Sequence, residues 1–203
     1  GVVENGFTKD MFESTRSYKE LKNVSNINLS KNNLSGWDFS GLNLSGAILK
    51  DSCLEDVNIT STNLSNTTGN GLTSNQFYTT INYKEKNLSG IDLSGNDMTG
   101  WDLSGQNLSE VKIKNSILDD VDISKANISK LSGFTLEQIY STKNYKIRDF
   151  SGINISDNNL TGIDFSYQNL SNANLRNTII KNANIIGANL TNTISNGLTA
   201  SQF

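Results

Sequence analysis

The sequence predicts a solenoid, a fold in which the chain winds through similar coils stacked on one another. Three runs of nine pentapeptides carry an apolar residue at every fifth position, from Val24 to Leu64, from Leu88 to Ile128 and from Phe150 to Leu190. A period of five matches neither the 3.6-residue period of a helix face nor the two-residue period of a half-buried strand. Each five-residue step is therefore interpreted as turning one corner of a coil.

Turn-forming residues flank the apolar positions. Of the 27 positions just before the apolar residue, 22 are Asn or Asp, and of the 27 just after it, 20 are Ser or Thr, as in Asn43-Leu44-Ser45-Gly46. Short polar side chains bond to nearby backbone, and Gly or Asn accepts positive φ. Each pentapeptide thus supplies one inward hydrophobe and one turn.

The composition agrees with such a repeat. Only 35% of the residues are hydrophobic, which without periodicity would indicate disorder. A solenoid has a one-dimensional core, so one or two apolar residues in five are enough. The predicted core includes Leu29, Leu34, Phe39, Leu44, Leu93, Met98, Leu103, Leu108, Ile155, Leu160, Phe165 and Leu170.

Pentapeptides such as Gly187-Ala188-Asn189-Leu190-Thr191 and Trp101-Asp102-Leu103-Ser104-Gly105 resemble the A-(D/N)-L-x-x motif of the pentapeptide-repeat family. The resemblance covers about two thirds of the chain in 27 tandem copies. It implies an all-β solenoid, a right-handed quadrilateral β-helix with four pentapeptides per coil. Coils would lie about 4.8 Å apart, so residues twenty apart should form ladders such as Leu88, Leu108 and Ile128.

Three breaks separate or precede these runs, at Gly6–Lys19, Gly71–Lys84 and Gly133–Lys146. Thr73 and Gln76 have the spacing of a capping box, and Leu72 with Phe77 has that of a hydrophobic staple. The third break repeats both devices with Thr135, Gln138, Phe134 and Ile139, whereas in the first break Met11 replaces the Gln and only the staple of Phe7 and Phe12 remains. Each break is predicted to be a short α-helix of two to three turns, followed by an extended return.

The expected organisation is a single solenoid over residues 1–203, with units at about 6–70, 71–132 and 133–196 and the start of a fourth at 197–203. Residues 197–203 repeat the opening of a break, so we expect the chain to be a segment of a longer array. Trp37 and Trp101 take inward positions, and Tyr18, Tyr83 and Tyr145 precede the corresponding sites by 18 or 19 residues. We expect these aromatic residues to pack against one another in the core.

Several classes of function lack their usual residues. The chain has no His and only one cysteine, Cys53. It therefore lacks the residues that usually form catalytic triads, zinc sites and a framework of disulfides. Asp92, Asp97 and Asp102 lie on successive corners, which would point their carboxylates in different directions. We expect no catalysis, cofactor or metal, and no membrane, because no run approaches eighteen apolar residues. No signal peptide follows Gly1, and the compartment is left open.

Outward apolar residues are the least ordinary surface feature. Where the Asn and Ser pattern fails, at one place in each run, the outward residues are Ile48, Cys53, Ile117 and Ile179. Two interpretations stay open: a helical break covers this face, or the residues form a contact stripe for a partner.

Two functional hypotheses follow. The first is a non-enzymatic structural or protein-interaction scaffold, with an unidentified protein as its partner and a monomeric state for this segment. The alternative, implied by the family resemblance, is a DNA mimic that inhibits or protects DNA gyrase, which needs a dense negative field. The chain has 20 acidic and 17 basic residues, a net charge of −3. This balance disfavours mimicry, and the lack of a basic footprint argues against nucleic-acid binding.

Overall fold

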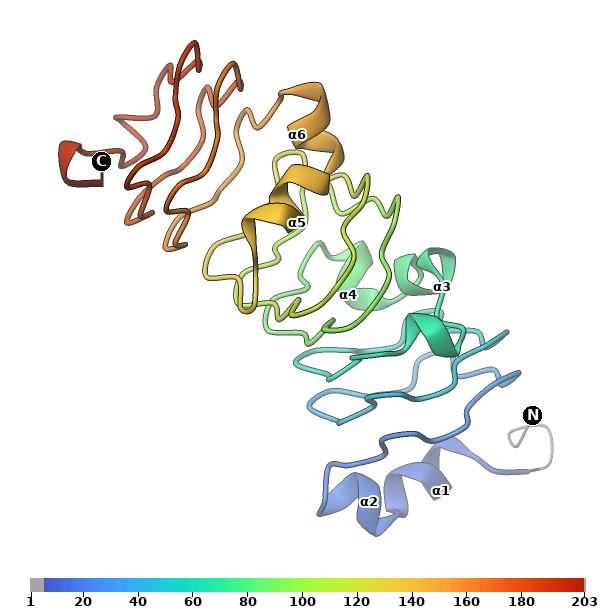
Figure 1. The fold of residues 1–203 in the computed structure, drawn as a ribbon. Helices are drawn as coiled ribbons and strands as arrows, with labels where there is room; N and C mark the ends of the chain where they lie inside the picture. Colours follow the sequence, from blue (N-terminus) through green and yellow to red (C-terminus); the bar gives the residue numbers. More distant parts are fainter. Residues whose placement is uncertain (1–5, 203) are drawn as a thin grey trace. The chain divides into compact units, whose positions relative to one another are not determined.

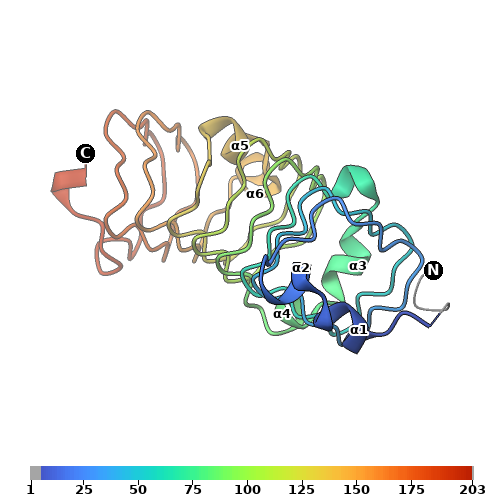
Figure 2. The same cartoon turned by 90° about the horizontal axis from the view of Figure 1, so that it is seen from below.

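A computed structural model describes residues 6–202, which form two compact units. Unit 1 holds the described residues up to Asp97 together with Lys112–Ser116. Unit 2 holds Met98–Val111 and the described residues from Ile117 onward. In each unit the chain winds through coils that lie side by side (Figure 1, Figure 2).

Parallel bridges join residues twenty apart, as the repeat predicts. One ladder of unit 1 runs through Asn23, Asn43, Asn63, Asp92 and Lys112. Each level is held from both sides, because the Leu44 N–H donates to the Asn63 carbonyl at 2.8 Å and the Asn63 N–H donates to the Leu42 carbonyl at 2.9 Å. A ladder of unit 2 runs through Asn107, Asn127, Asn154 and Asn174. The longer steps, Asn63 to Asp92 and Asn127 to Asn154, are the places where a break is inserted.

The apolar residues of the pentapeptides fill the interior of each unit. Leu34, Leu44, Met98 and Leu170 are fully buried, and the other eight predicted core residues are at most 4% exposed. Burying one such side chain stabilises the fold by about 1.5–3 kcal/mol. The inward side chains of the last coil, including Ile185 and Leu190, are only partly buried.

The Asn and Asp residues before each apolar position point outward and brace the turns. The Asn43 carboxamide oxygen accepts from the Ser45 N–H at 3.0 Å, and its Nδ2 donates to the Asn23 side chain of the neighbouring coil at 3.2 Å. A carboxylate makes the first bond but lacks the second donor. Asn therefore both closes its own turn and joins two coils, which explains its abundance.

Each of the three complete breaks contains two short helices rather than the single helix predicted. The helices are α1 (Lys9–Ser14) and α2 (Arg16–Lys19), α3 (Ser74–Tyr78) and α4 (Ile81–Lys84), and α5 (Leu136–Ser141) and α6 (Lys143–Ile147). The prediction was wrong because Thr15, Thr80 and Thr142 have extended backbones, with ψ of 151°, 150° and 153°, and each caps the second helix with its side chain. Two 3-10 helices, η1 (Thr68–Asn70) and η2 (Ala200–Gln202), complete the helical elements of residues 6–202.

The predicted capping boxes are confirmed in the second and third breaks, at Thr73 with Gln76 and at Thr135 with Gln138. In the first break the Thr8 side chain caps α1 without a capping box, because Met11 has no group to return the bond. At the last break the Thr199 N–H donates to the Gln202 side chain at 2.6 Å. Phe203, the expected staple residue there, lies outside the described residues.

Aromatic side chains of the first break pack into the coil that follows it. The ring of Phe12 lies 5.2 Å from Trp37, 5.5 Å from Tyr18 and 6.0 Å from Phe39, measured between centroids. Trp37 is 5% exposed and Trp101 is 6% exposed, so both side chains are core. In unit 2 the Tyr145 hydroxyl donates to the Asp164 carbonyl at 3.0 Å.

Candidate interaction surface at the breaks

An open hollow of about 540 Å³ lies in unit 1 where the second break leaves the coil. One wall is the coil segment from Lys50 to Cys53, and the other is formed by Gly71, Thr73 and Gln76. The two walls approach closely at Gly71, where a Cβ atom would lie 2.6 Å from the Lys50 Cβ. Gly71 also has φ of 94°, a backbone conformation that L side chains rarely adopt, so glycine is required there on both counts.

Gln76 fastens the break to the coil beneath it. Its Nε2 donates to the carbonyls of Leu49 and Ser52, both at 2.7 Å, while its Oε1 accepts from the Thr73 N–H. One side chain thus caps the helix and satisfies two carbonyls of the preceding coil. The sequence spacing predicts only the capping role of Gln76, not its two bonds to the coil.

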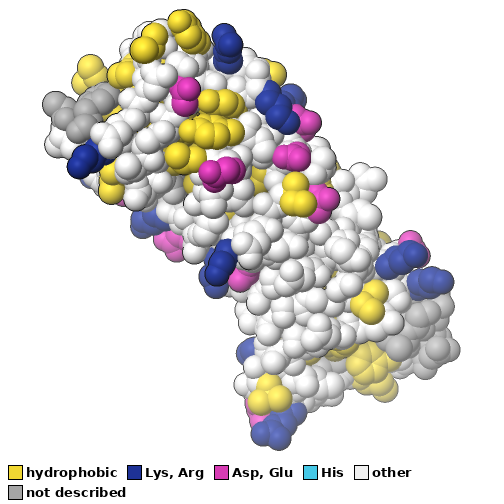
Figure 3. All heavy atoms as spheres, in the orientation of Figure 1, with side chains coloured by type: hydrophobic (Ala, Val, Ile, Leu, Met, Phe, Trp, Pro, Cys, Tyr) yellow, Lys and Arg dark blue, Asp and Glu magenta, His cyan; other side chains and the backbone are white. Residues whose placement is uncertain are grey.

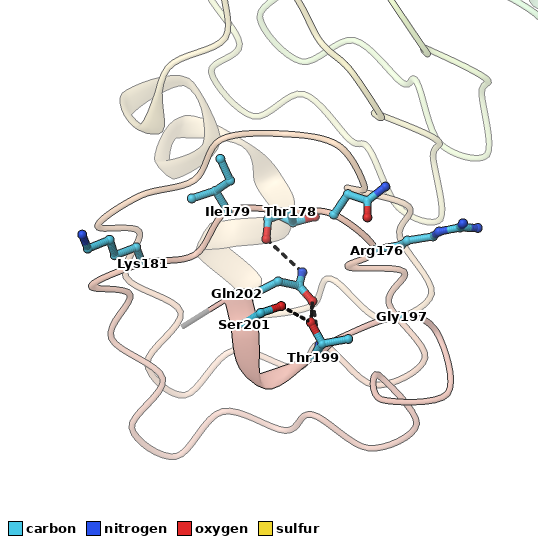
Figure 4. A pocket seen from close by; sticks show the side chains of 9 residues that line it. Arg176, Thr178, Ile179, Lys181, Gly197, Thr199, Ser201 and Gln202 are labelled. Carbon is cyan, nitrogen blue, oxygen red and sulfur yellow. Dashed lines mark hydrogen bonds between the residues drawn. The ribbon is translucent and has the colours of Figure 1, made fainter.

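Unit 2 repeats this hollow, with a volume of about 450 Å³, beside the last break (Figure 4). Gln202 takes the role of Gln76, and its Nε2 donates to the carbonyls of Leu175 at 2.5 Å and Thr178 at 2.9 Å. A Cβ atom on Gly197 would lie 2.7 Å from the Arg176 Cβ. The same framework is therefore built twice, at sites 126 residues apart in the sequence.

The two hollows differ in charge and in their outward residue. In unit 1 the hollow is lined by one positive and one negative residue, Lys50 and Asp51. In unit 2 it is lined by two positive residues, Arg176 and Lys181. Cys53 is exposed, with its Sγ 3.2 Å from the Ser35 hydroxyl. Its counterpart in unit 2 is Ile179, which is 50% exposed. The same framework therefore presents a polar surface in unit 1 and an apolar, cationic surface in unit 2.

The predicted stripe residues do not share one face within either unit: in unit 1, Ile48 bridges to Asn28, whereas Cys53, one pentapeptide later, bridges to Asn33. Ile48 is partly buried, and Ile117 is 47% exposed. Within unit 2, Ile117 lies two pentapeptides before the ladder through Asn127 and Asn174, while Ile179 lies one pentapeptide after it. A coil of four pentapeptides places these two isoleucines on different sides. Ile179 lines the hollow beside the last break, and the two isoleucines do not form a continuous stripe in unit 2.

Two asparagines that the sequence interpretation missed also hold the breaks. The Asn82 side chain accepts from the Ile59 N–H at 2.7 Å and donates to the Thr60 hydroxyl at 2.9 Å. Asn144 does the same with the Ile123 N–H at 2.8 Å and the Ser124 hydroxyl at 2.9 Å. Their recurrence before Tyr-Lys, 62 residues apart, is the signal that could have identified them.

Lysines of the breaks form ion pairs with carboxylates of the neighbouring coils. Lys84 contacts Glu55 and Asp56, Lys146 lies 2.8 Å from Asp120, and Lys143 lies 2.7 Å from Asp122. Hydrogen bonds to Glu55 and then Asp56 raise the pKa of Lys84 above its usual value. A lysine held protonated in this way is not a nucleophile.

The described residues include neither a cluster of metal-ligating side chains nor a helix long enough to span a membrane. Among residues 6–202, no three His, Cys, Asp or Glu side chains are grouped so as to hold a metal ion. The longest helices in this part of the chain, α1 and α5, have six residues each, too few to cross a bilayer.

The repeats of this chain match those of a known protein family. The sequence profile of pentapeptide repeats matches eight copies, over residues 23–60, 87–124 and 159–194, which together make up more than half of the chain. The chain belongs to the pentapeptide repeat family. No functionally curated protein matches the sequence.

Solved structures of pentapeptide repeat proteins are similar to the chain at low identity. HetL from Nostoc sp. strain PCC 7120, involved in heterocyst differentiation regulation, is 19% identical, with 83% of this chain and 86% of HetL covered and a TM-score of 0.27. Rfr23 from Cyanothece 51142 is 19% identical, with 70% and 93% covered and a TM-score of 0.24. The plasmid-mediated fluoroquinolone resistance protein QnrB1 is 14% identical, with 82% and 70% covered and a TM-score of 0.24. At these TM-scores the likeness carries no functional argument.

Proposed function

We propose that this pentapeptide repeat protein is a non-enzymatic scaffold, folded as one right-handed quadrilateral solenoid, that presents protein-binding surfaces at its breaks. The observation that carries the proposal is the repeated hollow held by Gln76 in unit 1 and by Gln202 in unit 2. A framework repeated with different wall residues supports recognition, because the framework supplies rigidity and the exposed residues supply specificity.

The polar residues support a scaffold over an enzyme. Asn and Asp side chains brace turns, and the lysines beside the breaks pair with carboxylates. General acid–base catalysis needs a titratable group left to act on a substrate in a water-excluding site. Both hollows are open to solvent, and their ionisable residues lie on the coil that forms one wall.

The charge distribution does not favour a DNA mimic. Mimicry needs carboxylates whose negative field is not cancelled nearby. In this chain Asp92, Glu110, Asp120 and Asp122 each have a lysine Nζ within 3.7 Å. Such pairs reduce the local field, in line with the net charge of −3.

The single native cysteine provides a test of the scaffold proposal. Cys53 lies in the hollow of unit 1 and is exposed, so a thiol-reactive benzophenone attached there would sample whatever occupies the hollow. We expect one discrete photo-crosslinked product in an extract of the producing cells. Excess unlabelled protein should abolish that product.

The competition arm makes the test specific to the hollow. A competitor carrying Lys50→Glu and Asp51→Lys reverses the charges of the hollow while keeping its framework. This competitor should fail to abolish the product. A benzophenone placed instead at Ser109→Cys in a Cys53→Ser background is the control for non-specific capture. Equal products from both labels, or equal competition by both proteins, would contradict the proposal.

A further inference from the structure

Three exposed hydrophobic residues lie in or next to one column of unit 2, on three consecutive levels. The bridges from Asp149 to Asn169 and from Asn169 to Asn189 fix the register, and two residues before them stand Ile147, Tyr167 and Gly187. Ile186, next to Gly187, accepts a backbone hydrogen bond from the Tyr167 N–H at 2.8 Å. Figure 3 shows hydrophobic side chains gathered on the coils that follow α6.

Two large side chains of this column, Ile147 and Tyr167, and the neighbouring Ile186 face solvent. Ile147 is 57% exposed, Tyr167 61% and Ile186 67%. The Tyr167 ring leans toward the next level, because a Cβ atom on Gly187 would lie 2.7 Å from its Cδ1. The Arg148 guanidinium carbon lies 5.8 Å from the centre of the same ring. The result is a short apolar ridge with one cation at its first level.

The preceding repeat shows that the fold does not require these residues. Sixty-two residues earlier, the places of Ile147, Tyr167 and Ile186 are taken by Glu85, Gly105 and Ser124. The third repeat therefore has large apolar residues at three places where the preceding repeat has polar or small ones. The change is costly at Tyr167, whose φ of 58° is a left-handed conformation that bulky residues rarely adopt. Strain and exposed apolar area together indicate a surface kept for binding.

We propose that this ridge, formed by Ile147, Tyr167 and Ile186, binds an amphipathic α-helix of a partner protein that carries an acidic residue opposite Arg148. The proposal rests on the scaffold function but uses a surface apart from the two hollows. The spacing supports a helix, because three levels of a β-stack span about 9.6 Å and the helix positions i and i+7 are about 10.5 Å apart.

An extended strand fits the ridge less well. Its same-face side chains recur about every 6.7 Å, so three of them span about 13.4 Å. The charge preference follows from Arg148, the cation that lies against the Tyr167 ring. A carboxylate on the helix would form a charge-assisted hydrogen bond with the guanidinium at the edge of the apolar contact.

The test uses model peptides in a titration followed by two-dimensional amide NMR of the whole chain. The main probe is a side-chain-bridged helical peptide of about sixteen residues, with leucines at i, i+4 and i+7 and a glutamate one turn before the first leucine. We expect saturable shifts centred on Ile147, Tyr167 and Ile186, with a Kd of about 1 mM or tighter. A peptide with lysine in place of that glutamate should bind at least about fivefold more weakly.

The matched variant restores the preceding repeat, with Ile147→Glu, Tyr167→Gly and Ile186→Ser together. It should fold, because those residues occupy the same places 62 residues earlier, and it should lose peptide binding. Ile194→Ser removes a 78% exposed isoleucine outside the ridge and should bind as the wild type does. Photo-crosslinking from Cys53 should be unchanged in the triple variant, so a failure of the ridge is distinguishable from a failure of the scaffold proposal.

Three results would overturn the helix proposal. The first is the absence of saturable shifts, or equal shifts in the triple variant. The second is tighter binding by an extended peptide of the same composition. The third is a dimer in sedimentation analysis that the triple variant abolishes, since a second copy would then occupy the ridge.

Discussion

The first and second breaks of unit 1 share a Phe and a Tyr position, at Phe12 with Phe77 and at Tyr18 with Tyr83, and differ in their amide side chains. Phe12 and Phe77 are equivalent, and both are buried, at 2% and 0% exposure. By contrast, Met11 stands where the second break has Gln76, and Ser17 stands where it has Asn82. The shared residues form the hydrophobic core of the break, and the variable ones form its bonds to the coil before it.

This difference separates two interfaces within one short motif. In the second break, Gln76 and Asn82 reach back to the coil from Leu49 to Thr60. In the first break, Met11 is 53% exposed, and the contacts run forward, with Phe12 against Trp37 and Lys9 Nζ donating to the Gly36 carbonyl at 2.8 Å. A break can therefore keep its forward packing while losing its backward bonds.

The largest expected effect comes from the shared aromatic residue. Replacing a fully buried Phe by Ala costs about 3–5 kcal/mol through lost burial and a residual cavity. We expect Phe12→Ala and Phe77→Ala to lower the free energy of unfolding by similar amounts, measured by urea denaturation. Phe7→Ala, at a partly buried edge contact 6.4 Å from Phe12, should cost much less and serves as the control. A large loss for Phe77 with none for Phe12 would show that the first break does not depend on its core.

A smaller effect should distinguish the two glutamine positions. Gln76→Met gives the second break the residue of the first, leaves the Leu49 and Ser52 carbonyls without their donor and removes half of the capping box. We expect a loss of about 1–3 kcal/mol. The reciprocal Met11→Gln should change stability by less than about 0.5 kcal/mol, because it adds only a local capping bond on an exposed helix. If Gln76→Met and Met11→Gln changed the free energy of unfolding by equal amounts, the second break would not depend on its bonds to the preceding coil more than the first break does.

The asparagine positions provide a similar pair with a local readout. Asn82→Ser removes the acceptor of the buried Ile59 N–H, and Asn144→Ser does so for Ile123. We expect each to cost about 1–2 kcal/mol and to speed hydrogen exchange at that one amide. Ser17→Asn is the matched control and should leave exchange unchanged throughout unit 1. Unchanged protection at Ile59 and Ile123 would mean that these bonds contribute nothing.

Sequence reasoning predicted the coils far better than the breaks, for a physical reason. In the coils one pattern repeats 27 times, so each inward Leu and each bracing Asn is identified by its neighbours. The break sequences occur only a few times. Each has about fourteen residues, which must contact both the coil before the break and the coil after it. The capping boxes were recognised by local spacing, but Thr80 and Thr142 were not seen as second caps, since a Thr in mid-break has no flanking signal of its own.

The candidate sites were hidden for a different reason. Gln76 and Asn82 act on carbonyls and amides more than twenty residues away, which local spacing does not reveal. The ridge through Tyr167 depends on the register that places Ile147 on the level before Tyr167 and Ile186 on the level after it. The prediction of an outward apolar feature identified Ile117 and Ile179 but placed them on one stripe, because the sequence alone did not show how the breaks shift the faces of the coil.

The smallest expected effect concerns the ion pair of the third break. Burial raises the pKa of Asp122, but hydrogen bonds from Lys143 and Ser124 outweigh it, so the folded-state pKa lies below the ordinary value. An unfolded Asp titrates near pH 3.9. The folded state therefore gains stability above about pH 4, and this gain is lost as the pH falls through the lowered pKa. We expect Asp122→Asn and Lys143→Met to be slightly less stable than the wild type at pH 7 and to converge with it as the pH falls through the lowered pKa of Asp122. Urea denaturation between these limits measures the difference. A variant that keeps the full wild-type dependence on pH would show that the pair contributes only to the geometry of α6 and not to its electrostatic stability.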